Sequence, residues 1–136
     1  MTWVDVCPLD RLVVDRGVAA LVGGEPVALF RLWGDELYAI DHCEPFTGAP
    51  VMARGLVGSA GGTPTVASPL HKERFDLRTG GCLDAPGRSV RTWPVRVTGG
   101  VVQVADRPAP RLNGHHRLNG VTSAADSRAN TGDPQT

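Results

Sequence analysis

The fold is decided by the stretch Ser68-Pro69-Leu70-His71-Lys72-Glu73-Arg74-Phe75-Asp76-Leu77-Arg78-Thr79-Gly80. Residues 74–77 are typical of a short β-strand, and Thr79-Gly80 is typical of the turn that ends it. The loop before the strand contains His71, a residue type that binds iron through its imidazole. The residue three positions earlier is Ser68, and a serine oxygen is a poor iron ligand compared with a cysteine thiolate. The stretch therefore joins a strand and turn to an incomplete pair of metal ligands.

Short β-rich runs separated by glycine and proline extend over residues 2–105. The expected strands are 3–6, 17–22, 26–33, 36–40, 65–67, 74–77, 90–97 and 101–104. The pairs Gly23-Gly24, Gly34-Asp35 and Gly99-Gly100 predict hairpin turns between neighbouring strands. No window keeps helical spacing, apart from one short turn within 8–14. The chain is therefore predicted to be all-β, an antiparallel β-sandwich or small barrel.

Two long stretches, 41–64 and 78–89, interrupt the strands. They exceed the length of a hairpin turn, and long loops in a compact domain are usually functional or disordered. Apolar strands flank both stretches, so we expect functional loops. We expect these two stretches to form a two-loop subdomain beside the strands.

The end of the chain differs in composition from the rest. From Asp106 onward, small residues and proline replace large apolar ones, and such a segment buries too little apolar surface to offset the entropy of ordering. We expect residues 1–106 to form one domain and residues 107–136 to form a disordered tail. The pair His115-His116 in that tail has no neighbouring ligands and is expected to be solvated.

Composition excludes several classes of function. The 136 residues include 14 basic and 14 acidic side chains, so no net field attracts nucleic acid or anionic lipid. No apolar stretch approaches the roughly 20 residues of a membrane span, and the N-terminus shows no leader pattern. The three cysteines form no close pair, which argues against disulfides. We expect a cytoplasmic protein that contacts neither membrane nor nucleic acid.

The two loops can be compared with the site of a Rieske [2Fe–2S] cluster, which needs two cysteines and two histidines. In a Rieske domain, one loop supplies these ligands as Cys-x-His and the other supplies them as Cys-x-x-His. In the stretch Asp41-His42-Cys43-Glu44-Pro45-Phe46, aligning the proline places Glu44 at the cysteine position and Phe46 at the histidine position. The other loop offers Ser68 and His71. One ligand of four remains, so we expect no metal site.

Another set of ligands does not restore the site. His42 and Cys43 are adjacent, and neighbouring side chains on an extended loop point apart. Together with His71 they are still one ligand short, and Cys82 would have to be recruited from the next turn.

Eight short stretches form a series that identifies a family. They are residues 3–7, 26–31, 38–40, 44–46, 54–57, 66–70, 74–77 and 99–104. With this series the chain resembles the small subunit of the assimilatory NADH-dependent nitrite reductase, a branch of the Rieske-like (ISP-type) fold that lacks the cluster ligands. The resemblance implies a non-catalytic subunit without its own cofactor. It also implies a large subunit with FAD, siroheme and a [4Fe–4S] cluster that reduces nitrite to ammonium.

Other motifs are consistent with this division of labour. Gly58 to Gly62 is expected to be a loop with no helix after it, unlike a dinucleotide-binding turn. No Ser/His/Asp or Cys/His arrangement is evident. The carboxylates Asp41, Glu44 and Asp76 are expected to be solvated, and the cysteines are expected to be small apolar residues.

The hypothesis for the loops is that their tips contact the large subunit. Pro45, Phe46, Pro69 and Leu70 would supply the apolar centre of the contact. His71, Lys72 and Arg74 would form a polar rim around this apolar centre. Two alternatives remain open: a Rieske-type [2Fe–2S] electron-transfer ferredoxin with unconventional ligands, and a free-standing regulatory module.

Overall fold

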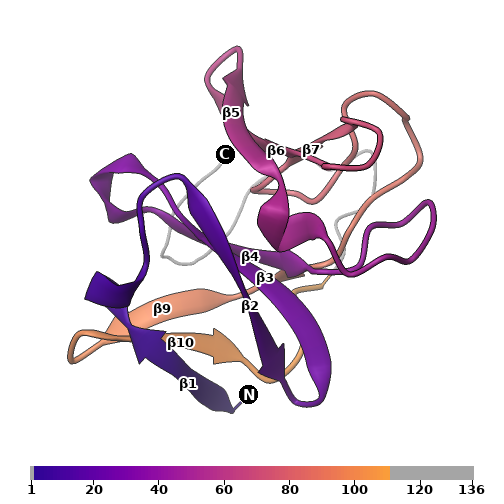
Figure 1. Cartoon of the computed structure of the whole chain (residues 1–136). Coiled ribbons are helices and arrows are strands. Elements are labelled where there is room, and N and C mark those ends of the chain that lie inside the picture. Colours follow the sequence, from indigo (N-terminus) through magenta and orange to yellow (C-terminus); the bar gives the residue numbers. More distant parts are fainter. Residues whose placement is uncertain (1, 111–136) are drawn as a thin grey trace.

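The computed structural model describes residues 2–110, in which short strands dominate (Figure 1). The strands are β1 (Trp3–Pro8), β2 (Arg16–Val22), β3 (Glu25–Arg31), β4 (Leu37–Asp41), β5 (Leu56–Ala60), β6 (Thr63–Ala67), β7 (Arg74–Asp76), β8 (Thr92–Trp93), β9 (Val95–Thr98) and β10 (Val101–Ala105). Three 3-10 turns join them: η1 (Leu9–Arg11), η2 (Trp33–Asp35) and η3 (Met52–Arg54). The predicted all-β class is confirmed, and η1 lies in the one stretch expected to turn helically.

The strands form three antiparallel sheets. Their strand orders are β1-β10-β9, β2-β3-β4-β8 and β5-β6-β7, and the described residues form no closed barrel. The four-stranded sheet lies between the other two, with β5–β7 on one side and β1, β9 and β10 on the other (Figure 1). The small-barrel form of the expectation is therefore not what the chain adopts.

Strand β3 shows why the four-stranded sheet is the middle layer. Val27, Ala28, Leu29 and Phe30 are all fully buried. Because successive side chains of a strand point to opposite faces, Ala28 and Phe30 enter one core cluster, while Val27 and Leu29 enter the other. A run of four apolar residues is therefore required here, since neither face of the strand meets water.

A hairpin turn within the stretch 41–64 corrects one expectation. Residues 56–60 form β5, which pairs with β6 in the register Ala60↔Thr63. The connecting Gly61 and Gly62 have φ values of 59° and 85°, which suit glycine because it has no Cβ. Gly23-Gly24 and Gly99-Gly100 adopt the same left-handed pair of conformations, so the three Gly-Gly turns are alike.

The expected strand 90–97 is also corrected. It divides at Pro94 into β8, which pairs with β4, and β9, which pairs with β10. Proline has no N–H to donate to a ladder, and the Pro94 carbonyl accepts a hydrogen bond from Ala105 N at 2.9 Å. The chain therefore changes sheet at this residue.

Beyond the predicted boundary at residue 106, the described chain continues to 110. Ala109 N donates to the Thr92 carbonyl at 2.7 Å, which holds this segment against β8. Most of the predicted tail, including His115-His116, lies outside the described residues. Among the described residues, no helix has the length and apolar character needed to cross a bilayer.

Candidate functional site: two loops with a shared backbone pattern

The first loop, residues 42–51, is built around a buried carboxylate. Glu44 has no exposed surface, which contradicts the expectation that it is solvated. Its side chain accepts hydrogen bonds from Phe46 N at 3.1 Å, from Thr47 N and from Thr47 Oγ1. The loop closes on itself, because Gly48 N donates to the Glu44 carbonyl and Glu44 N donates to the Ala49 carbonyl. The carboxylate is therefore the internal support of the loop.

The electrostatics of Glu44 follow from these contacts. Burial raises the pKa of its carboxyl group, since a charge is costly away from water. The hydrogen bonds from Thr47 and Phe46, with the nearby His71, outweigh that effect and leave the pKa of Glu44 below its ordinary value of 4.5. Glu44 is therefore an anion at neutral pH and lies within electrostatic reach of the second loop.

The second loop, residues 68–73, repeats the backbone pattern of the first. Ser68 N donates to the Glu73 carbonyl at 2.8 Å, and Lys72 N donates to the Ser68 carbonyl at 2.9 Å. The side chain of Ser68 is buried, and its Oγ accepts from Leu70 N at 3.2 Å. These bonds join residues with the same separations as in the first loop, 24 positions later. The two loops are therefore structural repeats with different central side chains.

The repeat extends to an unusual backbone conformation. Gly48 has a φ of 80°, and the corresponding Lys72 has a φ of 67°. A left-handed conformation suits glycine and costs about 1 kcal/mol or more for a residue with a Cβ. Lys72 keeps it because its N–H closes the second loop on the Ser68 carbonyl.

A third loop, residues 82–90, holds both repeats in place. Arg88 donates from Nη1 to the Pro45 carbonyl at 3.3 Å, and its guanidinium lies 5.1 Å from the centre of the Phe46 ring. Asp84 accepts hydrogen bonds from the backbone N, Nε and Nη2 of Arg74, the residue that follows the second loop. Neither Arg88 nor Asp84 carried a sequence signal, because their partners are 10 or more positions away.

Gly80 explains the Thr-Gly turn of the diagnostic stretch. It has a φ of 83°, and a Cβ there would come within 2.0 Å of the Val90 carbonyl oxygen. Gly80 N donates to Asp76, and Val90 N donates to the Gly80 carbonyl. The glycine thus allows β7 and the end of the third loop to meet closely.

The alternative ligands have structural partners of their own. His42 Nδ1 accepts a hydrogen bond from Ala53 N at 3.1 Å, so this nitrogen carries no proton. Burial and the nearby Arg54 lower the pKa of His42. Cys43 forms an isolated bridge with Pro50, and Cys82 is buried in the core. The structure thus brings no cysteine into the four ligand positions.

The other two carboxylates expected to be solvated, Asp41 and Asp76, contact arginines. Asp41 accepts from Arg91 Nε at 3.0 Å and from Trp93 Nε1 at 3.3 Å. Asp76 lies 3.6 Å from Arg78 Nε. The expectation was wrong because both carboxylates end strands, where an arginine 50 positions away reaches Asp41 and an arginine two positions away reaches Asp76.

The residues predicted to meet a partner divide into two groups. Pro69, Leu70, His71 and Lys72 are exposed, and Leu70 retains 44% of its accessible surface. Pro45 and Phe46 are half-buried, and Phe46 also packs against the core cluster of β3, β6 and β7. Among these predicted contact residues, the exposed apolar side chains are therefore those of the second loop, Pro69 and Leu70.

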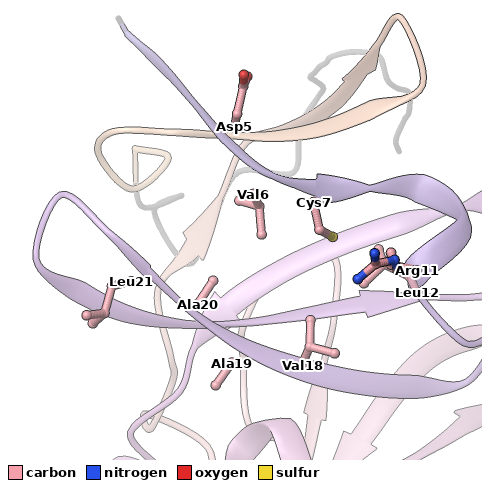
Figure 2. Close-up of a pocket in the computed structure, with 9 residues that line it drawn as sticks. All are labelled: Asp5, Val6, Cys7, Arg11, Leu12, Val18, Ala19, Ala20 and Leu21. Atoms are coloured by element: carbon pink, nitrogen blue, oxygen red, sulfur yellow. The ribbon is translucent and has the colours of Figure 1, made fainter.

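A separate hollow of about 420 Å³ lies between β1 and β2, which are the outer strands of two different sheets. Figure 2 shows Val6 and Cys7 pointing from β1 toward Val18 and Ala20 on β2. Burial raises the pKa of the Cys7 thiol, and the charge of Arg11 lowers it by less. Cys7 is thus a protonated thiol at neutral pH and lacks the activation of a nucleophile.

The fold and the paired loops define the class of the protein. Residues 2–105 match the family of the Rieske-like [2Fe–2S] domain, and the chain belongs to that family. Within it, the Escherichia coli K12 nitrite reductase (NADH) small subunit is 42% identical over 103 residues, which cover 75% of this chain and 95% of the relative. The NMR structure of the Escherichia coli protein NirD superposes with a TM-score of 0.71 at 41% identity, covering 76% of this chain and 94% of that one.

A third relative is a much longer protein. The Klebsiella oxytoca nitrite reductase [NAD(P)H] large subunit is 45% identical over 105 residues, which cover 77% of this chain but 11% of that protein. These relatives support the small-subunit interpretation over the ferredoxin alternative.

The residues at three of the four ligand positions do not fit the cluster in the family's description, and only His71 could serve as a ligand. Glu44 already accepts three hydrogen bonds within its loop, and Phe46 has no donor atom. Ser68 supplies a hydroxyl in place of a thiolate, and iron in these clusters requires sulfur and imidazole. Among residues 2–110, no three His, Cys, Asp or Glu side chains converge as metal ligands.

Proposed function

We propose that this chain is the accessory small subunit of an assimilatory NADH-dependent nitrite reductase, without a cluster of its own and located in the cytoplasm. The catalytic centres, FAD, siroheme and a [4Fe–4S] cluster, would belong to a large subunit that reduces nitrite to ammonium. The observation that carries the proposal is the buried Glu44, which supports the first loop where a cluster-bearing domain needs a cysteine. The loops then serve as a binding surface in place of a redox site.

The proposed contact combines apolar and basic groups. Pro69 and Leu70 are exposed at the tip of the second loop, and Phe46 lies at the first. His71 and Lys72 are exposed beside them. An apolar centre with a charged rim is the usual composition of a specific protein interface. The rigid backbone of both loops favours binding, because little conformational entropy is lost on association.

The long Klebsiella relative supports a large-subunit partner. Its similarity to this chain is confined to 11% of its length, so a domain of this kind belongs to the same polypeptide as the rest of that protein. Covalent linkage keeps the two parts at a high effective concentration. The corresponding parts of a two-chain enzyme must find each other by binding, which requires a docking surface on this chain.

Co-purification with the candidate large subunit tests the proposal. Leu70→Glu places a charge at the centre of the contact and should abolish co-purification and NADH-dependent nitrite reduction by the mixture. Leu21→Glu is the matched control, because Leu21 is a 72%-exposed leucine on β2 and belongs to neither loop. Phe46→Glu should act like Leu70→Glu, provided its circular dichroism is unchanged.

Metal analysis separates the proposal from the ferredoxin alternative. The purified chain, prepared anaerobically, should be colourless and contain no stoichiometric iron. About two irons per chain with visible absorption would overturn the cluster-free part. Equal co-purification of Leu70→Glu and wild type would overturn the docking surface.

A further inference from the structure

Trp33 is the most exposed large apolar side chain among residues 2–110, with 86% of its surface accessible. It begins the turn η2 between β3 and β4. The turn is held by Arg31, whose Nε and Nη2 donate to Asp35 at 2.9 and 2.6 Å and whose Nη1 donates to the Leu12 carbonyl at 2.9 Å. The indole is therefore presented to solvent by an ordered turn, although its exposure costs free energy in water.

The indole lines a groove of about 380 Å³ between η2 and the β5–β6 hairpin. Leu32, Val57 and Pro64 supply apolar lining, and Asp15 and Glu36 supply carboxylates. No lysine or arginine lines the groove. Its composition is thus apolar and acidic, in contrast to the basic second loop.

The opposite wall of the groove is the edge of a sheet. β5 is an outer strand of the sheet β5-β6-β7, and its residues 57–59 line the groove. Gly58 and Ser59 are small and exposed, so an approaching chain can reach the backbone. An outer strand offers unpaired N–H and C=O groups that an extended segment can bind.

The other two tryptophans indicate what the indole lacks. Arg96 lies 4.2 Å from the ring centre of Trp3, and Arg91 lies 5.4 Å from that of Trp93. No arginine or lysine within residues 2–110 lies over the ring of Trp33. A cation over an indole face is attracted by its quadrupole, and the carboxylates of the groove strengthen that attraction.

We propose that this groove binds an extended, arginine-bearing segment of the partner large subunit, with the guanidinium against Trp33 and the two groove carboxylates. The charge of the groove selects a basic segment, and the free edge of β5 selects an extended one. This inference rests on the proposed function and adds a second contact, separate from the two loops. Figure 1 shows the η2 turn and the second loop on different sides of the β5–β6 hairpin.

Affinity measurements with the full chain and its large subunit test the groove. Trp33→Ala should raise the dissociation constant roughly 30-fold, which is the effect typical of an aromatic side chain at the centre of an interface. The double variant Asp15→Lys, Glu36→Lys should weaken binding and make it less sensitive to salt. Leu21→Ala is the control and should change the constant by less than about twofold.

Iodide quenching of tryptophan fluorescence gives an independent readout. Trp33 is exposed, whereas Trp93 is buried. Complex formation should therefore reduce quenching of the wild type, and Trp33→Phe should abolish most of that change. An unchanged Trp33 accessibility in the complex would overturn the groove proposal.

The remaining outcomes distinguish the groove from the docking function. If Leu70→Glu abolishes the complex while the Trp33 and carboxylate variants bind like wild type, the docking function stands and the groove proposal fails. If the wild-type chain forms no complex, both fail together. A dimer of the isolated chain that shields Trp33 would identify a second copy as the occupant and would also overturn the proposal.

Discussion

The first and second loops have the same backbone hydrogen bonds, but their centres differ. The first encloses Glu44, which accepts three hydrogen bonds, and the second encloses Ser68, which accepts one from Leu70 N. In both, the backbone of the central residue, Glu44 or Ser68, donates to a carbonyl five positions on and accepts from an N–H four positions on. The backbone pattern is therefore independent of the side chain at its centre.

This comparison teaches how the loops are held by contacts of the chain's own residues. The first loop is supported by an internal carboxylate, and the second is short enough to close through its own backbone. The third loop then anchors each one, through Arg88 for the first and through Asp84 for the second. Changes to each element should separate these contributions.

The largest effect is expected for Glu44→Ala. It removes the acceptor of three hydrogen bonds, two of them from the backbone N–H groups of Phe46 and Thr47, which should lower the free energy of unfolding by about 3 kcal/mol. Urea denaturation measures this loss. Glu44→Gln, which keeps an acceptor oxygen, is the control and should lose less. An alanine variant as stable as wild type would show that water replaces the carboxylate.

A smaller effect is expected from substitutions at Gly48 and Lys72, the two loop residues with a left-handed backbone conformation. Gly48→Ala should lower the free energy of unfolding by about 1 kcal/mol, because alanine disfavours a positive φ. No atom lies within 4 Å of the added Cβ, so the cost is conformational. Lys72→Gly should raise stability by about 0.5 kcal/mol or leave it unchanged. A loss in both variants would mean that the loops are not equivalent at this position.

Ser68→Ala should cost about 1 kcal/mol, since one neutral hydrogen bond to Leu70 N is lost. Thermal and urea unfolding should both place it well below Glu44→Ala in effect. Thr47→Ser, which keeps the hydroxyl of the first loop, is a control for general sensitivity of the tips. If Ser68→Ala were the more damaging variant, the second loop would depend on its side chain more than its backbone.

The smallest effect is expected at the anchor of the second loop. Hydrogen bonds from the Arg74 side chain and backbone lower the pKa of Asp84 from 3.8 to about 2. Because the folded pKa is the lower one, the stabilisation is present above pH 3.8 and disappears as the pH falls toward 2. Asp84→Asn should flatten this part of the stability profile measured by urea titration. An unchanged acid profile would show that the pair contributes nothing in solution.

Much of the fold could be predicted from local pattern. The apolar run 27–30, the Gly-Gly turns and the stretch from Ser68 to Gly80 each carry a signal within a few residues, because strand alternation and turn conformation are local properties. Gly61-Gly62 has the same turn signal as the other two pairs, although the sequence prediction places it within one long loop. Pro94 could likewise have marked the break between β8 and β9.

The candidate site was less accessible to sequence reasoning. The loss of ligands at positions 44, 46 and 68, with His71 kept at the fourth, is visible in the sequence, but the burial of Glu44 is not. A glutamate in a loop is usually solvated, and only the closed backbone of the first loop supplies its three donors. The sequence predicts Trp33 as the end of the strand 26–33, whereas the structure places it in the turn η2, on which its exposure depends.

The sequence by itself determined the all-β class, the family and the absence of thiolates at the ligand positions, because these depend on residue types and short spacings. Only the tertiary structure decided that the four-stranded sheet is the middle layer, that Glu44 supports the first loop and that Trp33 lines an acidic groove. The layering and the groove join residues far apart in the chain, such as Trp33 and Val57, and the role of Glu44 depends on its burial in the folded chain. Such contacts arise from packing between elements, which no local pattern encodes.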